Sequence, residues 1–161
     1  MGWLQAVFSI VFGIVNVALG VLSVLTPWVQ DSAMRDIYLT KVDKAKLADI
    51  RSDVCATMSK MECYKATATY RASIATIVLI SLTMIGSVLY VTLCFIDGVP
   101  VTAKTSVLFF TVSFSYLGIM VFPVQVNVIG TWHTGFWLWL CAVLLDVWIA
   151  VEHTVELIHD V

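Results

Sequence analysis

Two sets of residues in this 161-residue sequence are of types that could do chemistry. Cys55 and Cys63 are separated by seven residues, which fits a disulfide in an oxidising compartment or two free thiols in the cytosol. We favour the disulfide. His153, Glu156 and His159 fall at positions i, i+3 and i+6, so one helical face could present all three to a metal ion. A solvated tail would have the same composition, and we favour the tail over a metal site.

The sequence has none of the motifs by which an enzyme is usually recognised. It contains no Cys-x2-Cys pair, no glycine-rich phosphate loop and no His-Glu-x-x-His pair. An enzyme would need a nucleophile with its base, a metal set or a cofactor loop. The net charge is only -2 and no basic run is interleaved with aromatic residues, which argues against nucleic acid as a partner. We therefore expect no enzymatic activity, no cofactor and no nucleic-acid partner.

The composition places the chain among membrane proteins. Hydrophobic residues make up 60% of it and charged residues 12%, and the mean hydropathy is +0.96, which is outside the range of soluble domains. A helix needs about 20 apolar residues to cross the roughly 30 Å of bilayer hydrocarbon. The chain has four stretches of about this length: Trp3 to Thr26, Ile74 to Ile96, Ser106 to Val126 and Gly135 to Val151. We predict an all-α fold, a single tetraspan domain of four transmembrane helices in a lipid bilayer, with both termini on one side.

Asp146 lies inside the fourth apolar stretch, where a carboxylate costs about 2.5–3.5 kcal/mol on insertion scales and usually faces a partner. Counted at the helical rise, it lies roughly 16 Å inward from Gly135, and Asn16 lies roughly 18 Å inward from Trp28. Because the first and fourth spans run antiparallel, the two side chains can meet at equal depth. We predict an interhelical hydrogen bond between Asn16 and Asp146. An ion or proton relay is the alternative, but it would need more acidic residues.

The polar segment from Trp28 to Ser73 is the large loop between the first two spans. It carries eight of the nine Lys/Arg residues and six of the eleven Asp/Glu residues. Pro27 ends the first helix, and Trp28 follows where aromatic rings collect at membrane interfaces. Within the loop, residues 41–50 could form a short surface helix, and residues 55–63 fit a short hairpin held by the two cysteines.

Two features of the sequence make opposite predictions about the side of the membrane on which this loop lies. The positive-inside rule places a loop with this many basic residues in the cytoplasm. A disulfide requires the opposite side, and a loop of this length approaches the size at which charge counting loses its force. The family resemblance described next is the main reason to favour an exported loop and cytoplasmic termini. Cys94 would then lie near the inner membrane surface, where it is a candidate for palmitoylation, with a plain buried thiol as the alternative.

These features together resemble the superfamily of claudins, peripheral myelin protein and nematode claudin-like proteins, which includes the gamma subunits of calcium channels. The resemblance lies in the four spans, the large first loop, Trp28 just after the first span, and the pair Cys55 and Cys63 late in that loop. Arg71 matches the family's arginine at the foot of the second span. The fourth span opens with a glycine and an aromatic run, Phe136, Trp137 and Trp139, which we expect at the level of the lipid headgroups.

The resemblance implies a left-handed four-helix bundle whose extracellular first loop is locked by a disulfide and includes a small β-sheet. It implies a multi-pass protein of the plasma membrane that contributes to cell junctions, cell–cell contact or membrane organisation. The expected partners are copies of itself or related tetraspan proteins, both laterally and across cells. The alternative is an auxiliary, gamma-like subunit of a larger ion channel or receptor complex.

Overall fold

The computed structural model describes the backbone of residues 3–31, 34–126 and 130–159, with side chains over 7–30, 34–122, 132–155 and 158. The helices are α1 (Trp3–Leu25), α2 (Leu47–Thr57), α3 (Lys60–Phe95), α4 (Val101–Val126) and α5 (Thr134–His159). The strands are β1 (Val29–Asp31), β2 (Asp36–Ile37), β3 (Lys41–Val42), β4 (Ala45–Lys46) and β5 (Gly130–Trp132). Four of the helices, α1, α3, α4 and α5, are long and apolar enough to cross a membrane. The predicted fold class is confirmed.

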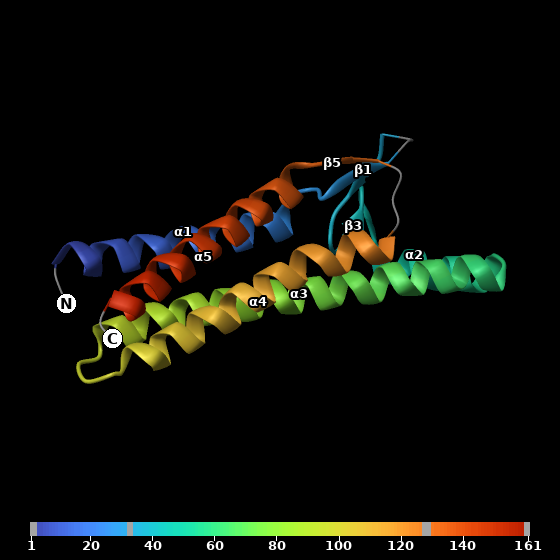
Figure 1. The fold of residues 1–161 in the computed structure, drawn as a ribbon. Helices are drawn as coiled ribbons and strands as arrows, with labels where there is room; N and C mark the ends of the chain where they lie inside the picture. The colour runs from blue at the N-terminus through green and yellow to red at the C-terminus, as the bar shows by residue number, and fades with distance from the viewer. Residues whose placement is uncertain (1–2, 32–33, 127–129, 160–161) are drawn as a thin grey trace.

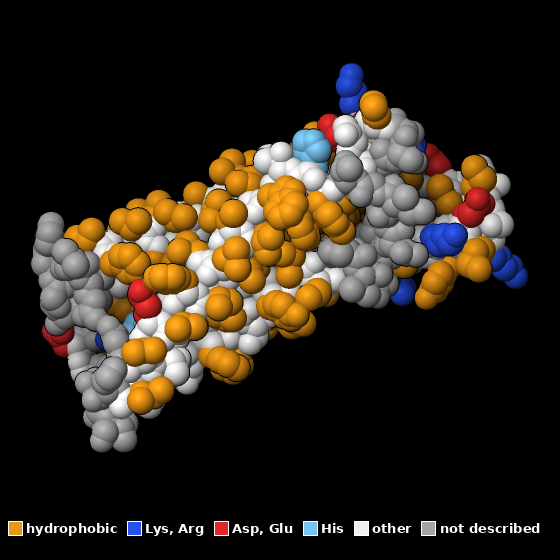
Figure 2. All heavy atoms as spheres, turned by 45° about the horizontal axis from the view of Figure 1, so that its top comes forward, with side chains coloured by type: hydrophobic (Ala, Val, Ile, Leu, Met, Phe, Trp, Pro, Cys, Tyr) orange, Lys and Arg blue, Asp and Glu red, His pale blue; other side chains and the backbone are white. Residues whose placement is uncertain are grey.

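The four long helices form one bundle in which each packs against two neighbours. α1 and α4 each lie against both α3 and α5. Figure 1 shows that α1 begins and α5 finishes at the same end of the bundle, whereas the sheet lies at the opposite end. Hydrophobic side chains cover the face of the bundle seen in Figure 2, and most of the Lys and Arg side chains in view gather near the sheet. This distribution fits a membrane-spanning bundle with a polar domain at one end.

The second long helix begins much earlier than predicted. The expected span was Ile74 to Ile96, but α3 begins at Lys60. Its start is fixed by a capping box: the backbone N–H of Glu62 donates to the Ser59 hydroxyl, and the Ser59 N–H donates to the Glu62 carboxylate. The helix therefore extends about 17 Å beyond Arg71, counted at 1.5 Å per residue.

Two predictions for the large loop were wrong. Residues 41–46 are not the first part of a surface helix, because they form β3 and β4 around a tight turn at Asp43 (φ 49°), and α2 begins only at Leu47. Residues 55–63 are not a β-hairpin, because Cys55 lies in α2 and Cys63 in the first turn of α3. We call β1–β5, α2, residues 60–71 of α3 and the turns that join them within the large loop the head.

The other spans differ from their predicted ranges only at the ends. α1 ends at Leu25, one residue before the predicted end, and Pro27 follows. α4 begins at Val101, directly after Pro100, and not at Ser106. α5 continues to His159, beyond the predicted end at Val151. Polar residues near the start of α4 and the end of α5 explain the two extensions, because a helix can continue after its apolar part has left the hydrocarbon.

Candidate functional site

The two loops at the sheet end of the bundle fold together as one unit. Their strands form a five-stranded antiparallel sheet in the order β4-β3-β2-β1-β5, in which the first four strands come from the large loop. The fifth comes from the short loop between α4 and α5, where Val29 of β1 lies opposite Trp132 of β5. β5 was not predicted, because a three-residue strand leaves no periodic pattern in a sequence. The sheet fixes the head relative to α1 and α5.

A helical hairpin projects from the head beyond the sheet. α2 packs along the first part of α3, and the predicted disulfide Cys55–Cys63 is present near the turn, with Cα atoms 4.4 Å apart. The guanidinium of Arg51 lies 4.7 Å from the centre of the Tyr70 ring, which joins the two helices further along. The bridge stabilises the hairpin by about 2–3 kcal/mol on the chain-entropy model.

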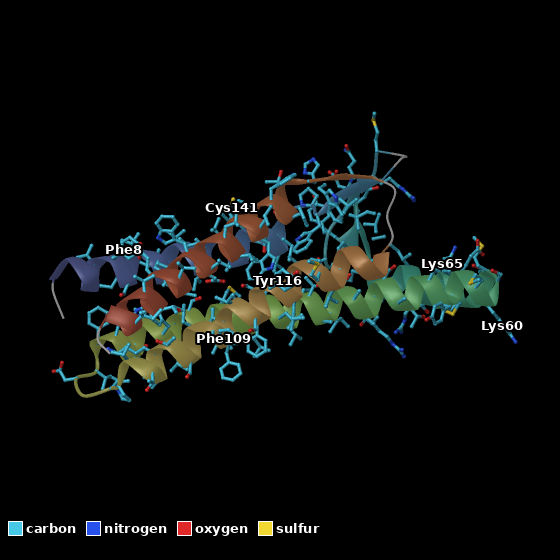
Figure 3. All side chains as sticks on the ribbon, viewed as in Figure 1. Phe8, Lys60, Lys65, Phe109, Tyr116 and Cys141 are labelled. Carbon is cyan, nitrogen blue, oxygen red and sulfur yellow. A yellow bond between two sulfur atoms is a disulfide. The ribbon has the colours of Figure 1, made fainter. Side chains whose placement is uncertain are left out.

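The free end of this hairpin exposes large apolar side chains. Met58, Met61 and Tyr64 have exposed fractions of 60%, 65% and 72%. Lys60 and Lys65 project from the same end, away from the bundle (Figure 3). A membrane cannot cover these side chains, because the charged residues of the head lie between them and the apolar part of α3. We call Met58, Met61 and Tyr64 the tip.

Trp28 connects the head to the bundle. Its ring is fully buried and packs edge-on against Phe122 of α4 and Phe136 of α5, and its indole N–H donates to the carbonyl of Ser23 at 2.7 Å. The expected position at the end of the first span is correct, but the ring points into the protein and does not form an interfacial aromatic belt.

Gly135 completes the contact at Trp28. Its backbone N–H donates to the carbonyl of Pro27 at 2.8 Å, and the N–H of His133 donates to the carbonyl of Trp28 at 2.9 Å. A methyl group on Gly135 would meet the Trp28 ring at 2.6 Å and two backbone carbonyl oxygens, of Ser23 and Pro27, at 2.9 Å. We call Ser23, Pro27, Trp28 and Gly135 the joint.

Asn16 and Asp146 are brought together in the middle of the bundle. Both side chains are fully buried, and the Asn16 amide donates to Asp146 Oδ1 at 2.5 Å. The buried Ser115 of α4 lies beside the same carboxylate. Asp146 Oδ2 and Asn16 Oδ1 have no partner among the described residues. The pair links α1 to α5 in the middle of the bundle.

We expect the Asn16–Asp146 bond to be measurable as a coupling energy. A double-mutant cycle of Asn16→Leu, Asp146→Leu and the double variant should give a coupling of about 0.6–1.7 kcal/mol, the range known for hydrogen bonds between membrane helices. Asn16→Leu alone should lower the free energy of unfolding by more than the loss of the Asn16 side-chain contacts would predict. The reason is that it leaves the buried Asp146 carboxylate without the Asn16 amide as a donor. The measurement is the free energy of unfolding in mixed detergent micelles. Strictly additive effects would mean that the two groups do not interact.

Three further sequence candidates lie in different surroundings. Arg71 is exposed on α3, one turn before the apolar part begins. Cys94 is 6% exposed and packs in a cluster with Tyr90 and Leu108, so the structure favours the plain buried thiol over palmitoylation. His153 is hydrogen-bonded through Nε2 to the Tyr90 hydroxyl and is therefore not part of a solvated tail. The side chains of Glu156 and His159 lie outside the described residues.

The burial of two aromatic residues was not expected from the sequence. Trp139 was expected among headgroups, but it is fully buried and its indole N–H donates to the carbonyl of Ser115 at 3.1 Å. Tyr90 was not singled out, although a tyrosine deep in an apolar span needs a partner for its hydroxyl. Helical spacing from Gly135 could have shown that Trp139 faces the same way as Gly135, toward the core.

The described side chains do not include a cluster of metal ligands. Among them, no group of three or more His, Cys, Asp or Glu residues could hold a metal ion. Comparison of the chain with protein-family models, with curated proteins and with solved structures finds no match in any of the three. The function of the chain is therefore inferred from the geometry of the head and from the sequence.

Proposed function

We propose that this chain is a claudin-like membrane protein whose head makes contacts for cell junctions, cell–cell adhesion or membrane organisation. The observation that carries the proposal is the tip, where three large apolar side chains are exposed at the end of a disulfide-clamped hairpin. Exposed apolar groups at the end of a rigid support are typical of a recognition surface. The expected partners are a second copy of this chain or a related tetraspan protein.

The proposed orientation places the head outside the cell and both termini in the cytoplasm, with the protein in the plasma membrane. A disulfide persists in an oxidising compartment, which is the argument for an exported head. The eight basic residues of the large loop oppose it. However, this loop contributes most of a folded unit with its own sheet, and long translocated domains cross largely regardless of their charge.

The head also differs from the family pattern at one point. Claudins carry Gly-Leu-Trp ahead of their cysteine pair, whereas this chain has Ser52, Asp53 and Val54 there, within α2. The contacts that this head makes should therefore come from its helical hairpin as much as from its sheet. For this reason the decisive experiment is directed at the hairpin.

Met61→Ser should weaken association of the full-length protein by about tenfold, because a central contact residue is typically worth more than 1 kcal/mol. The measurement is homotypic association in mild detergent and enrichment of the protein at contacts between expressing cells. Met34→Ser is the matched control, since Met34 is 83% exposed in the head but lies outside the hairpin. Thiol labelling of intact cells before and after reduction reports the orientation in the same samples. Equal association of both variants, or labelling only after permeabilisation, would contradict the proposal.

An auxiliary subunit is the second candidate, and a groove between α1 and α3 favours it. This groove has a volume of about 430 Å³ and is lined by apolar and small side chains, among them Ile10, Gly13, Ala18 and Val91. Small residues on a lipid-facing surface let a foreign helix approach closely. A large subunit that co-purifies with the chain at a fixed ratio would favour this function over self-association.

A further inference from the structure

A slot opens between the sheet, α2 and α3, on the side of the head that meets the bundle. Its volume is about 370 Å³, within the roughly 300–1,000 Å³ typical of small-molecule sites. The walls are mainly apolar: Leu39, Leu47, Ala48, Ile74 and Ile77 line it. Leu39 and Leu47 are almost fully buried, so these walls are held in place by the core of the head.

Two lysines lie at the polar end of the slot. Lys41 of β3 and Lys46 of β4 line it and lie directly opposite each other in the antiparallel pairing. Like charges in this position repel each other and destabilise a sheet. No acidic residue is among the described residues that line the slot, and the Lys41 ammonium lies 4.6 Å from the centre of the Tyr38 ring, which does not neutralise its charge. An anion between the two ammonium groups would remove the repulsion.

A buried hydroxyl lies in the wall between the charged and apolar parts. Ser73 is 1% exposed and lines the slot, and its hydroxyl has no hydrogen-bond partner among the described residues. Thr69 and Ser81 of α3 donate to the carbonyl four residues earlier in the helix, whereas the buried Thr76 hydroxyl, which does not line the slot, also has no described partner. Leaving a buried hydroxyl unpaired costs free energy. The Ser73 oxygen is buried in the empty slot, so a polar group of a bound molecule would satisfy this hydroxyl by displacing the neighbouring wall.

The slot crosses the level at which the protein enters the membrane. Ile74 and Ile77 belong to the apolar part of α3, and Ile74 is 45% exposed on the surface that faces lipid. Lys41 and Lys46 belong to strands β3 and β4 of the head. An occupant that fits this arrangement has a hydrocarbon tail, a hydrogen-bonding linkage and an anionic headgroup, in that order.

We propose that the slot binds an anionic phospholipid of the surrounding bilayer. One acyl chain lies against Leu39, Leu47 and Ile77, an ester oxygen accepts from the Ser73 hydroxyl, and the phosphate lies between Lys41 and Lys46. Charge-assisted hydrogen bonds from the two ammonium groups supply the selectivity for anionic over zwitterionic headgroups. The site does not depend on what the tip recognises, or on which side of the membrane the head lies.

The test is native mass spectrometry of the purified full-length protein released from nanodiscs of phosphatidylcholine with or without phosphatidylglycerol. The wild-type chain should retain one phosphatidylglycerol molecule in preference to phosphatidylcholine by about tenfold, as expected for two charge-assisted contacts. Lys41→Gln/Lys46→Gln should lose this preference. Lys60→Gln/Lys65→Gln is the matched control, because it removes the same charge from the far end of the hairpin and should retain the lipid (Figure 3).

Two further variants separate a lost site from a misfolded protein. Ala48→Phe should block the slot and abolish retention of both lipids. Ser73→Ala should weaken retention severalfold without lowering the melting temperature, because it removes a hydroxyl that is unpaired in the empty slot. Wild-type retention in Lys41→Gln/Lys46→Gln and in Ser73→Ala would overturn the proposal. So would retention of added oleate with no retention of phosphatidylglycerol, because the occupant would then be a free fatty acid.

Discussion

Gly135→Ala should destabilise the protein by about 1–3 kcal/mol, the usual cost of forcing an extra carbon into a filled space. Helix propensity predicts the opposite sign, since alanine is favoured over glycine by about 1 kcal/mol within a helix. Packing should dominate because the added methyl group would meet the carbonyl oxygens of Ser23 and Pro27 at 2.9 Å. These are backbone atoms of α1 and its end, and they cannot move aside without separating α1 from α5.

Gly20→Ala is the control for this prediction. A methyl group there would also be crowded, at 2.8 Å from the sulfur of Met84, but this atom is part of a flexible side chain that can rotate away. The measurement is the free energy of unfolding of each variant in mixed detergent micelles. If Gly135→Ala proved as stable as Gly20→Ala, α1 and α5 would not be in the close contact that the structure describes.

The two substitutions also distinguish a change that stays within the bundle from one that is transmitted to the sheet. Gly20 lies within the bundle, whereas Gly135 lies where the bundle meets the sheet through the bond between His133 and Trp28. Displacing α5 at Gly135 should therefore also displace β5. Loss of protection from hydrogen exchange in β1 and β5 together would show that head and bundle form one cooperative unit.

The bundle could be predicted from the sequence because lipid imposes simple requirements. An apolar stretch of about 20 residues must be helical in a bilayer, so the four spans follow from composition alone. The same reasoning located Asn16 and Asp146 at equal depth, since helical rise converts residue number into depth. To predict their hydrogen bond, the only further fact needed was that α1 and α5 run antiparallel.

The head could not be predicted in the same way because its structure depends on tertiary contacts. β2, β3 and β4 have two residues each, too few for a periodic pattern, and the sheet places them by pairing with neighbours. The start of α3 was recoverable, because Ser59 and Glu62 have the spacing of a capping box. This local signal lies outside the apolar stretch that predicts the span, which begins only at Ile74.

The burial of Trp28 could not be deduced from its position in the sequence. A tryptophan after the last residue of a span suits the membrane interface equally well. The deciding contacts come from Phe122 and Phe136, which are about 100 residues away in the chain. The slot beside Lys41 and Lys46 was missed for the same reason, since its walls come from two strands and two helices.

Trp28→Ala should be the most damaging single substitution, lowering the free energy of unfolding by about 3–5 kcal/mol, as for other fully buried aromatic residues. The ring fills the space between α1, α4 and α5, and no neighbouring side chain can collapse into it without moving a helix end. The joint lies at the end of α1, where unfolding would expose the Trp28 ring to water. Burial of the ring at this position therefore still gains hydrophobic free energy.

Trp28→Phe separates the ring from its hydrogen bond. It keeps most of the apolar volume but loses the indole N–H that donates to the Ser23 carbonyl, so we expect a cost nearer to 1 kcal/mol. Gly135→Ala should remain destabilising in the Trp28→Ala background, because two of its three close contacts are with backbone carbonyls that the truncation leaves in place. Full relief of Gly135→Ala by Trp28→Ala would show that the tryptophan ring alone, and not the path of the α1 backbone, holds the helices at this distance.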